Sequence, residues 1–70
     1  MYIILKKMKN NIEKLRKEKG ITQEQLADTV EVTRQTINAI ENDKYCPTLT
    51  LAFKIAKYFN KSIEEIFFYE

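Results

Sequence analysis

The sequence predicts a single compact all-α domain of five helices, preceded by a short N-terminal extension. Between residues 10 and 67, apolar residues recur at intervals of three and four, the period of amphipathic helices. A residue that can cap a helix precedes each apolar set. The chain has only one glycine and one proline, which argues against a turn-rich all-β fold. We therefore expect an extension over residues 1–9 and one helical domain over residues 10–70.

Composition indicates a small globular chain and excludes several kinds of site. The 70 residues are 44% hydrophobic and 31% charged, near the lower size at which one core sustains a fold without metal or disulfides. The chain has no histidine and one cysteine, Cys46, so neither an internal disulfide nor a structural zinc site is expected. We expect Cys46 to be a packing residue, with a redox or intermolecular role as the alternative. No apolar run approaches the roughly 20 residues of a membrane helix, and residues 2–5 are too few for a signal peptide, so a cytoplasmic chain is expected.

Charge is unevenly distributed along the chain, although the net charge is only +2. Residues 1–20 hold seven Lys or Arg against two Glu, whereas residues 21–48 hold two basic residues against five acidic ones. A basic stripe is the usual electrostatic feature of a nucleic-acid-binding protein, and this central stretch lacks one. Phosphate contacts there would have to rest on helix N-termini, amide groups and a few cations.

Residues 1–9 combine a short β-prone run with lysines. They fit a frayed tail, or an upstream extension ahead of a second start at Met8. The other interpretation is a strand that pairs with the same segment of a second protomer, because an isolated strand edge needs a partner. The sequence leaves these alternatives open.

The first helix is expected to begin near Asn10, with Glu13 at the capping-box distance, and to end at Gly20. Arg16 shares a face with two apolar residues of this helix, at a position where a third core residue would be expected. Such an arginine needs either a route to solvent or a carboxylate partner.

The stretch from Thr22 to Asn42 holds two short helix patterns with almost nothing between them. Thr22 and Gln25 have the spacing of a capping box, and Thr33 is suited to cap the second helix. The short connection leaves too little chain for antiparallel packing and predicts a steep helix-turn-helix crossing. The residues expected to be buried are Leu26, Ala27 and Val30 in the first of these helices, and Ile37 and Ile40 in the second.

The exposed face of the second of these helices has an unusual composition. A solvated helix surface is normally rich in Lys and Glu, whereas this face carries the Arg, Gln, Asn and Thr side chains that make directional contacts to bases. Arg34 and Gln35 can make bidentate contacts with guanine and adenine respectively, and Asn38 is a third candidate for base contact. The candidates for phosphate contact are Thr33, Thr36, Asn42, Lys44 and Tyr45, with packing on the next helix as the alternative for Tyr45.

Two further helices are predicted after a loop over residues 43–47. Their end signals are Thr48 and a Ser62–Glu65 capping box at the N-termini, and Asn60 at a C-terminus. The residues expected to face the core are Leu49, Ala52, Ile55, Ala56 and Phe59, followed by Ile63, Ile66 and Phe67. The remaining aromatic residues, Phe68 and Tyr69, either close the core edge or lie in an interface.

Several of these segments together resemble a known family. They are Leu15–Arg16 with Gly20, then residues 21–27, 32–37, 40–42, 44–45 with Pro47, 51–56 and 62–67. Over residues 10–67 the chain resembles Cro/repressor-type (Xre-like) helix-turn-helix domains. The resemblance implies a five-helix, repressor-like domain that binds double-stranded operator DNA as a homodimer, with the second helix of the motif in the major groove. It also implies that Gln23 donates to a DNA phosphate, and that Arg16 pairs with Glu41 as in some phage repressors.

One position departs from the family pattern. Many members have glycine in the turn where this chain has Glu31, a position that often has a positive φ. A glutamate in the left-handed region costs roughly 1–2 kcal/mol relative to the right-handed region. We therefore expect either local strain or a different turn conformation.

Other classes of function have less support. The same fold could serve as a protein-interaction module, for instance an antitoxin that binds a protein partner and regulates its own synthesis through DNA. No enzyme activity and no cofactor or metal site are expected, because the chain lacks histidine, a glycine-rich phosphate loop and a carboxylate cluster beside a base. A small-molecule sensor would need a ligand-binding domain, and these residues are taken up by the helical domain.

Overall fold

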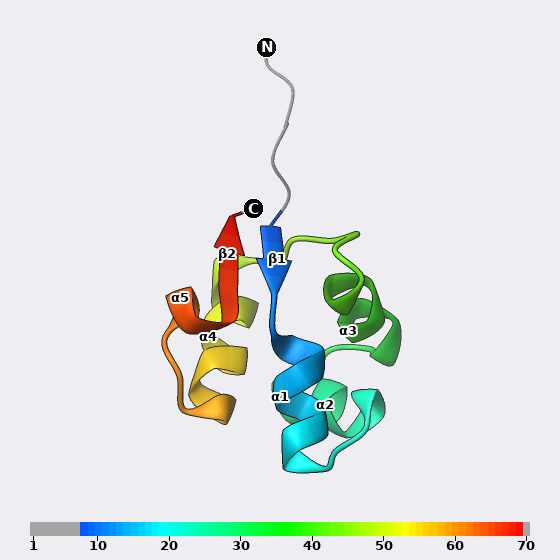
Figure 1. The fold of residues 1–70 in the computed structure, drawn as a ribbon. Helices are drawn as coiled ribbons and strands as arrows, with labels where there is room; N and C mark the ends of the chain where they lie inside the picture. The colour runs from blue at the N-terminus through cyan, green and yellow to red at the C-terminus, as the bar shows by residue number, and fades with distance from the viewer. Residues whose placement is uncertain (1–7, 70) are drawn as a thin grey trace.

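The computed structural model describes residues 8–69, which form five helices and a two-stranded sheet (Figure 1). In chain order the elements are β1 (Met8–Asn10), α1 (Ile12–Lys19), α2 (Gln23–Val30), α3 (Arg34–Glu41), α4 (Leu49–Phe59), α5 (Ile63–Ile66) and β2 (Phe67–Tyr69). The prediction of five helices is confirmed, and the small sheet is added to it. No helix within residues 8–69 has both the length and the apolar character needed to cross a membrane.

Four helices begin where the capping residues predicted. The hydroxyls of Thr22 and Ser62 each accept the backbone N–H of the third residue of the helix, and their own N–H groups donate to the side chain of that residue, so both capping boxes are formed. The hydroxyls of Thr33 and Thr48 accept from the third residues of α3 and α4. These bonds satisfy N–H groups that a helix start leaves without partners.

The predicted capping box at the start of α1 is wrong. α1 begins at Ile12, and the residue before it makes no side-chain capping bond. Asn10 is instead the last residue of β1, where its Oδ1 accepts from the N–H of Ile12 and its Nδ2 donates to the carbonyl of Ile40 at 2.8 Å. Glu13 pairs with Lys17 one turn later, which lowers the pKa of the Glu13 carboxyl. The partner of Asn10 is 30 residues away, so a local spacing rule could not anticipate it.

β1 and β2 pair antiparallel, with Met8 opposite Tyr69 and Asn10 opposite Phe67. The strand in residues 8–10 therefore pairs with β2 of its own chain. The prediction that the N-terminal segment pairs with a second protomer concerns mainly residues 1–7, which lie outside the described residues, and it stays a prediction. Of the C-terminal aromatic residues, Phe67 is buried, whereas Phe68 and Tyr69 are exposed.

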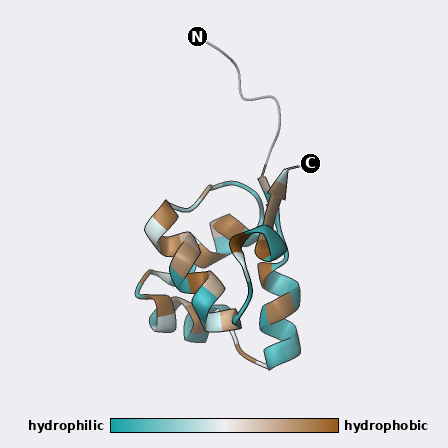
Figure 2. Cartoon of the chain, turned by 90° about the vertical axis from the view of Figure 1, so that its left-hand side faces the viewer, coloured by the Kyte–Doolittle hydropathy of each residue, from teal (hydrophilic) through white to brown (hydrophobic). Residues whose placement is uncertain are grey.

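Each of the five helices contributes to one hydrophobic core. Its largest fully buried side chains are Ile12, Leu26, Ile37, Ile40, Ile55 and Ile66. Hydrophobic and hydrophilic segments alternate along the helices, as amphipathic packing requires (Figure 2). The prediction that Leu49 faces the core is wrong, because Leu49 is 69% exposed and Leu51 is buried. The buried stripe of α4 is centred on Leu51 and Ile55, so Leu49 and Phe53 lie beyond its outer edge.

Candidate nucleic-acid interface

The turn between α2 and α3 has the left-handed conformation that its position predicted. Glu31 has φ +66° and ψ +45°, and the N–H of Val32 donates to the carbonyl of Ala27 at 2.9 Å. This is the Schellman motif at a helix C-terminus, in which the left-handed residue is usually glycine. The Glu31 carboxylate accepts from Nζ of Lys54 on α4 at 2.9 Å, which lowers the pKa of that carboxyl. Local sequence patterns did not indicate this ion pair between Glu31 and Lys54.

α3 presents its polar face to solvent at the surface of the domain. Arg34, Gln35 and Asn38 are exposed, while Ile37 and Ile40 on the other side are buried. The side chains of Arg34 and Gln35 make no hydrogen bond or ion pair with any other residue in the range 8–69. Their donors and acceptors are therefore available for a ligand in the first turn of the helix.

The threonines at the start of α3 are already engaged with each other. Thr33 Oγ1 accepts the N–H of Thr36, and the two hydroxyls lie 3.0 Å apart. Thr33 is exposed and Thr36 is half-buried, so both lie at the edge of the polar face. If either hydroxyl also contacted a phosphate, it would do so while keeping its hydrogen bond in this cap.

Gln23 belongs to a hydrogen-bond network rather than lying free at the start of α2. Its Nε2 donates to Oε1 of Glu41 at 2.9 Å, and its Oε1 accepts from Nδ2 of Asn38 at 3.4 Å. Asn42 in turn donates to the main-chain carbonyl and the side-chain oxygen of Asn38. Gln23 therefore has one Nε2 hydrogen left for a ligand, with its direction set by Glu41. Sequence spacing gave no signal of this link between the two helices.

Arg16 and Glu41 lie in contact below this network. Arg16 Nε donates to Glu41 Oε2 at 2.8 Å, its second guanidinium nitrogen donates to Oε1 at 3.3 Å, and its third to the carbonyl of Ile21 at 3.0 Å. The side chains are only 10% and 3% exposed. The hydrogen bonds to Glu41 raise the pKa of Arg16. The pair joins α1 to the last turn of α3, and each of the three guanidinium nitrogens has an acceptor.

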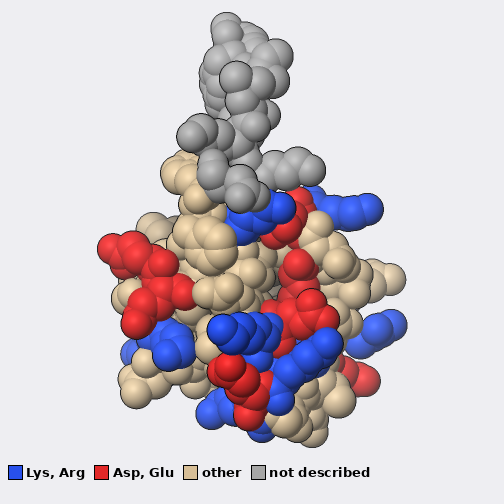
Figure 3. Space-filling model, viewed as in Figure 1, with Lys and Arg blue, Asp and Glu red and all other residues tan. Residues whose placement is uncertain are grey.

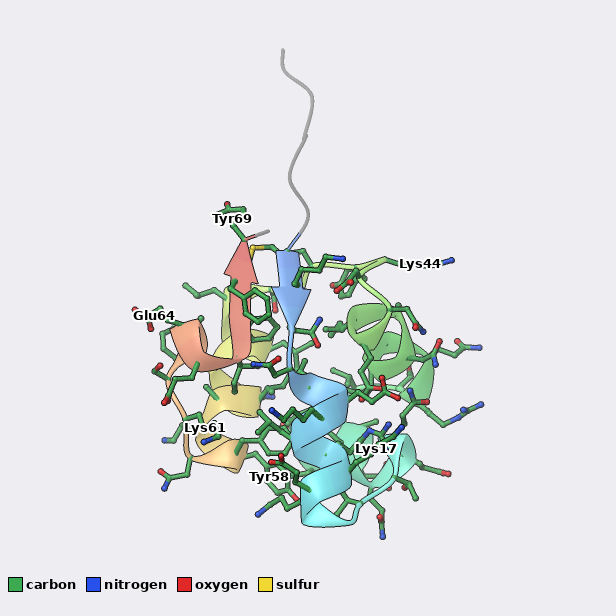
Figure 4. The ribbon with its side chains drawn as sticks, viewed as in Figure 1. Lys17, Lys44, Tyr58, Lys61, Glu64 and Tyr69 are labelled. Carbon is green, nitrogen blue, oxygen red and sulfur yellow. The ribbon has the colours of Figure 1, made fainter. Side chains whose placement is uncertain are left out.

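The loop after α3 begins with a second left-handed residue. Asp43 has φ +61°, and the N–H of Lys44 donates to the carbonyl of Ala39 at 2.9 Å. Lys44 extends away from the body of the molecule at this loop (Figure 4). Tyr45 is 46% exposed and lines a hollow together with residues of α3 and α4, so it is partly packed and partly available. The prediction that Cys46 is a packing residue is wrong, because Cys46 is exposed in this loop.

Side chains of β1 form hydrogen bonds and an ion pair at the C-terminal end of α3. Besides its bond to Ile40, Asn10 donates to Oδ1 of Asp43 at 3.3 Å, and Nζ of Lys9 lies 3.3 Å from Oδ2 of the same carboxylate. These contacts satisfy a carbonyl at the helix end and hold the loop that carries Lys44. Asn10 and Asp43 are thus positioning residues that the sequence patterns missed.

Electrostatics around the site are mixed rather than strongly basic. On the face that Figure 3 shows, Lys and Arg side chains alternate with Asp and Glu. Within residues 8–69, no group of three or more His, Cys, Asp or Glu side chains is placed to hold a metal ion. The surface offers hydrogen-bond donors in fixed positions and a few cations. Such a surface is better suited to recognising specific chemical groups than to binding any negatively charged molecule through long-range attraction.

Comparisons with known proteins agree with this geometry. The family model described as helix-turn-helix matches residues 12–66. An uncharacterized HTH-type transcriptional regulator of Methanocaldococcus jannaschii is 56% identical over 63 residues, which cover 90% of this chain and 96% of that protein. The uncharacterized HTH-type transcriptional regulator YgzD of Bacillus subtilis is 49% identical over the same shares of the two chains.

A solved structure shares the fold as well. The restriction-modification controller protein C.AhdI from Aeromonas hydrophila superposes with a TM-score of 0.72 at 25% sequence identity, covering 79% of this chain and 83% of that one. The helix-turn-helix geometry, the family match over most of the chain and these relatives all point to one assignment. The chain belongs to the Xre-like helix-turn-helix family of DNA-binding transcriptional regulators.

Proposed function

We propose that this protein regulates transcription by binding a specific, pseudo-palindromic operator as a homodimer, in the cytoplasm. The observation that carries the proposal is the polar face of α3, where the side chains of Arg34 and Gln35 are exposed and make no hydrogen bond with other described residues. A helix with such a face can enter the major groove with its first turn against base edges. The named relatives are HTH-type transcriptional regulators and a restriction-modification controller, which supports the same class of function.

The roles of the contacting residues follow from their positions. Arg34 and Gln35 read base edges, and Asn38 is a third reader whose amide is shared with Gln23 and Asn42. The phosphate contacts come from side chains around the polar face: Gln23, Thr33, Thr36, Asn42, Lys44 and Tyr45. With a net charge of +2, these few contacts predict a shallower decrease of affinity with salt than strongly basic repressors show.

A homodimer would present two copies of α3 to one face of the DNA. Their N-termini would lie about 34 Å apart, the repeat of the major groove, so two-fold symmetry in the protein would select two-fold symmetry in the site. Bound there, the dimer would block or recruit RNA polymerase, depending on where the operator lies.

Selection of bound sequences from random double-stranded DNA tests the proposal. We expect two related half-sites whose centres are separated by about one helical turn, roughly 10 base pairs. A single half-site without symmetry would contradict the homodimer on DNA. If no sequence were enriched at low salt, sequence-specific regulation would be wrong, and the protein-interaction alternative, such as an autoregulating antitoxin, would be favoured.

A further inference from the structure

A continuous chain of side-chain hydrogen bonds runs from the buried Glu41 carboxylate to the exposed face of α3. Nε2 of Gln23 donates to Oε1 of Glu41 at 2.9 Å, and Nδ2 of Asn38 donates to Oε1 of Gln23 at 3.4 Å. Nδ2 of Asn42 then donates to Oδ1 of Asn38 at 3.2 Å. The side chain of Glu41 is only 3% exposed, Gln23 is half-buried, and the two asparagines are exposed. We call Gln23, Asn38 and Asn42, with Glu41 at their inner end, the amide chain.

The two ends of the amide chain give it one direction. An amide group can present either its N–H or its oxygen to a neighbour, so its orientation depends on what that neighbour can donate or accept. At the inner end, the Glu41 carboxylate is ion-paired with Arg16 and can only accept, so Gln23 presents Nε2 to it. At the outer end, the main-chain carbonyl of Asn38 can only accept, and Nδ2 of Asn42 donates to it at 2.9 Å. Both ends therefore direct the side-chain oxygen of Asn38 toward Asn42 and its nitrogen toward Gln23.

Asn38 keeps part of its hydrogen-bonding capacity for a ligand. Nδ2 uses one of its two hydrogens on Gln23, and Oδ1 uses one of its two lone pairs on Asn42. One donor and one acceptor of this exposed amide remain without a partner among residues 8–69. A neighbouring donor and acceptor match N7 and N6 of adenine in the major groove, whereas guanine offers two acceptors there. An amide that could turn over would also donate to O6 of guanine, and the amide chain prevents that turn.

We infer that Glu41 is a positioning residue for base recognition, which acts through Gln23 to fix the Asn38 amide in an orientation that selects adenine. This inference rests on the proposed function, and it adds a base identity and the residues that enforce it. Glu41 is buried, so it acts without touching the DNA. Because Arg16 holds its carboxylate, the orientation of the amide is set before DNA binds, and less ordering is needed on binding.

Gln23→Met tests the middle of the amide chain, because methionine has nearly the shape of glutamine but lacks its amide donor and acceptor. Asn38→Ala first identifies the base pair that Asn38 contacts, as the one at which base preference is lost. At that base pair we expect the unmodified protein to prefer adenine by about tenfold or more, and Gln23→Met to lose most of that preference. Fluorescence anisotropy with operators that differ at this base pair measures both. The preference is a ratio of affinities within one variant, so a general loss from the phosphate contact of Gln23 cancels.

Glu24→Met is the matched control, since Glu24 is exposed beside Gln23 and takes no part in the amide chain. It should keep the adenine preference. Gln23→Met should also keep the preference at the base pairs that Arg34 and Gln35 contact. When Gln23→Met and Asn38→Ala are combined, the preference should equal that of Asn38→Ala alone, because the two residues act as one unit.

Glu41→Gln tests the source of the direction. Its amide can donate to Gln23 as well as accept from it, so the Asn38 amide is no longer held in one orientation. We expect the adenine preference to fall while non-specific binding persists, both measured below the melting temperature of the variant. A second measurement needs no DNA: in nuclear magnetic resonance spectra, the side-chain NH₂ signals of Asn38 should shift in Gln23→Met and in Glu41→Gln but not in Glu24→Met.

These measurements separate failure of the inference from failure of the proposed function. If an operator is selected but Gln23→Met keeps the full adenine preference, the inference is wrong and operator binding stands. The inference is also wrong if Asn38→Ala loses preference for a base other than adenine, or for none. If no DNA sequence is ever selected, the proposed function is wrong and base selection by Asn38 is wrong with it, whereas the NH₂ signals still show whether the amide chain orients Asn38.

Discussion

Arg16 on α1 and Glu41 in the last turn of α3 form an ion pair in a nearly dry site, and Gln23 of α2 donates to the same carboxylate. The buried carboxylate of Glu41 thus accepts hydrogen bonds from side chains of both α1 and α2. Since the attraction between two buried charges is offset by the water they lose, such a pair adds little net stability, yet it is costly to break. Its main consequence is geometric, because it holds α3 and the side chain of Gln23 in one arrangement.

Removing the carboxylate should destabilise the fold strongly. Glu41→Ala leaves the Arg16 guanidinium buried without its partner, which predicts a loss of about 3 kcal/mol in the free energy of unfolding. For a domain of this size, that corresponds to a decrease of roughly 10–20 °C in melting temperature, measured by circular dichroism. Glu18→Ala, on the exposed side of α1, is the control and should change stability by less than about 0.5 kcal/mol. A melting temperature equal to that of the unmodified protein would contradict the structural role of the pair.

Loss of the Asn10 side chain should loosen the end of α3. Asn10→Ala removes the hydrogen bonds to Ile12, Ile40 and Asp43, and we expect about 1–2 kcal/mol of destabilisation. Hydrogen exchange should quicken at the N–H of Lys44, which closes this helix end. Asn11→Ala removes one exposed hydrogen bond and is the matched control, with a smaller effect on both measurements. Equal effects from the two substitutions would show that Asn10 does not hold α3.

Base and phosphate contacts should respond differently to substitution. Arg34→Ala removes a bidentate contact, so we expect a loss of about 1–3 kcal/mol of discrimination at one base position with weak non-specific binding retained. Gln23→Ala should weaken binding to all sequences alike, except for differences at the base pair that Asn38 contacts. Fluorescence anisotropy with the selected operator and with single-base variants measures both, below the melting temperature of each variant. If Arg34→Ala lowered affinity for every sequence equally, Arg34 would be a phosphate contact instead.

The backbone strain at Glu31 should outweigh what its exposed ion pair with Lys54 contributes to stability. Lys54→Ala breaks an exposed pair and should cost less than about 1 kcal/mol. Glu31→Asn also removes the pair, but asparagine adopts the left-handed region more readily, so we expect stability within about 1 kcal/mol of the unmodified protein or above it. Chemical denaturation of the two variants measures the difference. A larger loss for Glu31→Asn than for Lys54→Ala would show that the backbone strain is negligible.

Stability should decrease in acid through the exposed glutamates. The N–H of Ser62 lowers the pKa of Glu65, and lysine partners lower those of Glu13 and Glu31, from the usual value of 4.5. Because these folded-state values lie below the unfolded one, the carboxylates stabilise the fold above pH 4.5 and lose that contribution as pH falls through their folded values. The melting temperature should therefore decrease below pH 4.5. Glu65→Gln keeps an acceptor at the capping position and should make this decrease smaller, whereas an unchanged acid profile would exclude a contribution from Glu65.

Much of the fold followed from signals within four residues of each other. The hydroxyls of Thr22, Thr33 and Thr48 cap helices because the N–H groups they satisfy are three residues away, and the apolar period fixes which side of each helix is buried. The wrong prediction for Leu49 also comes from relying on apolar periodicity alone. The period identifies a stripe, but only the neighbouring helices decide where the edge of that stripe lies.

The sequence by itself determined the five helices, the helix-turn-helix connection and the exposed polar face of α3, since each depends on local hydrogen bonding and periodicity. Long-range packing was needed to pair β1 with β2, to place Asn10 at the end of α3, to bring Gln23 to the carboxylate of Glu41 and to bring Lys54 to Glu31. Each of these contacts joins residues that are 18 or more positions apart. Their partners are chosen by the packing of the whole core, and a single residue can satisfy its donors in many ways until that packing removes the alternatives.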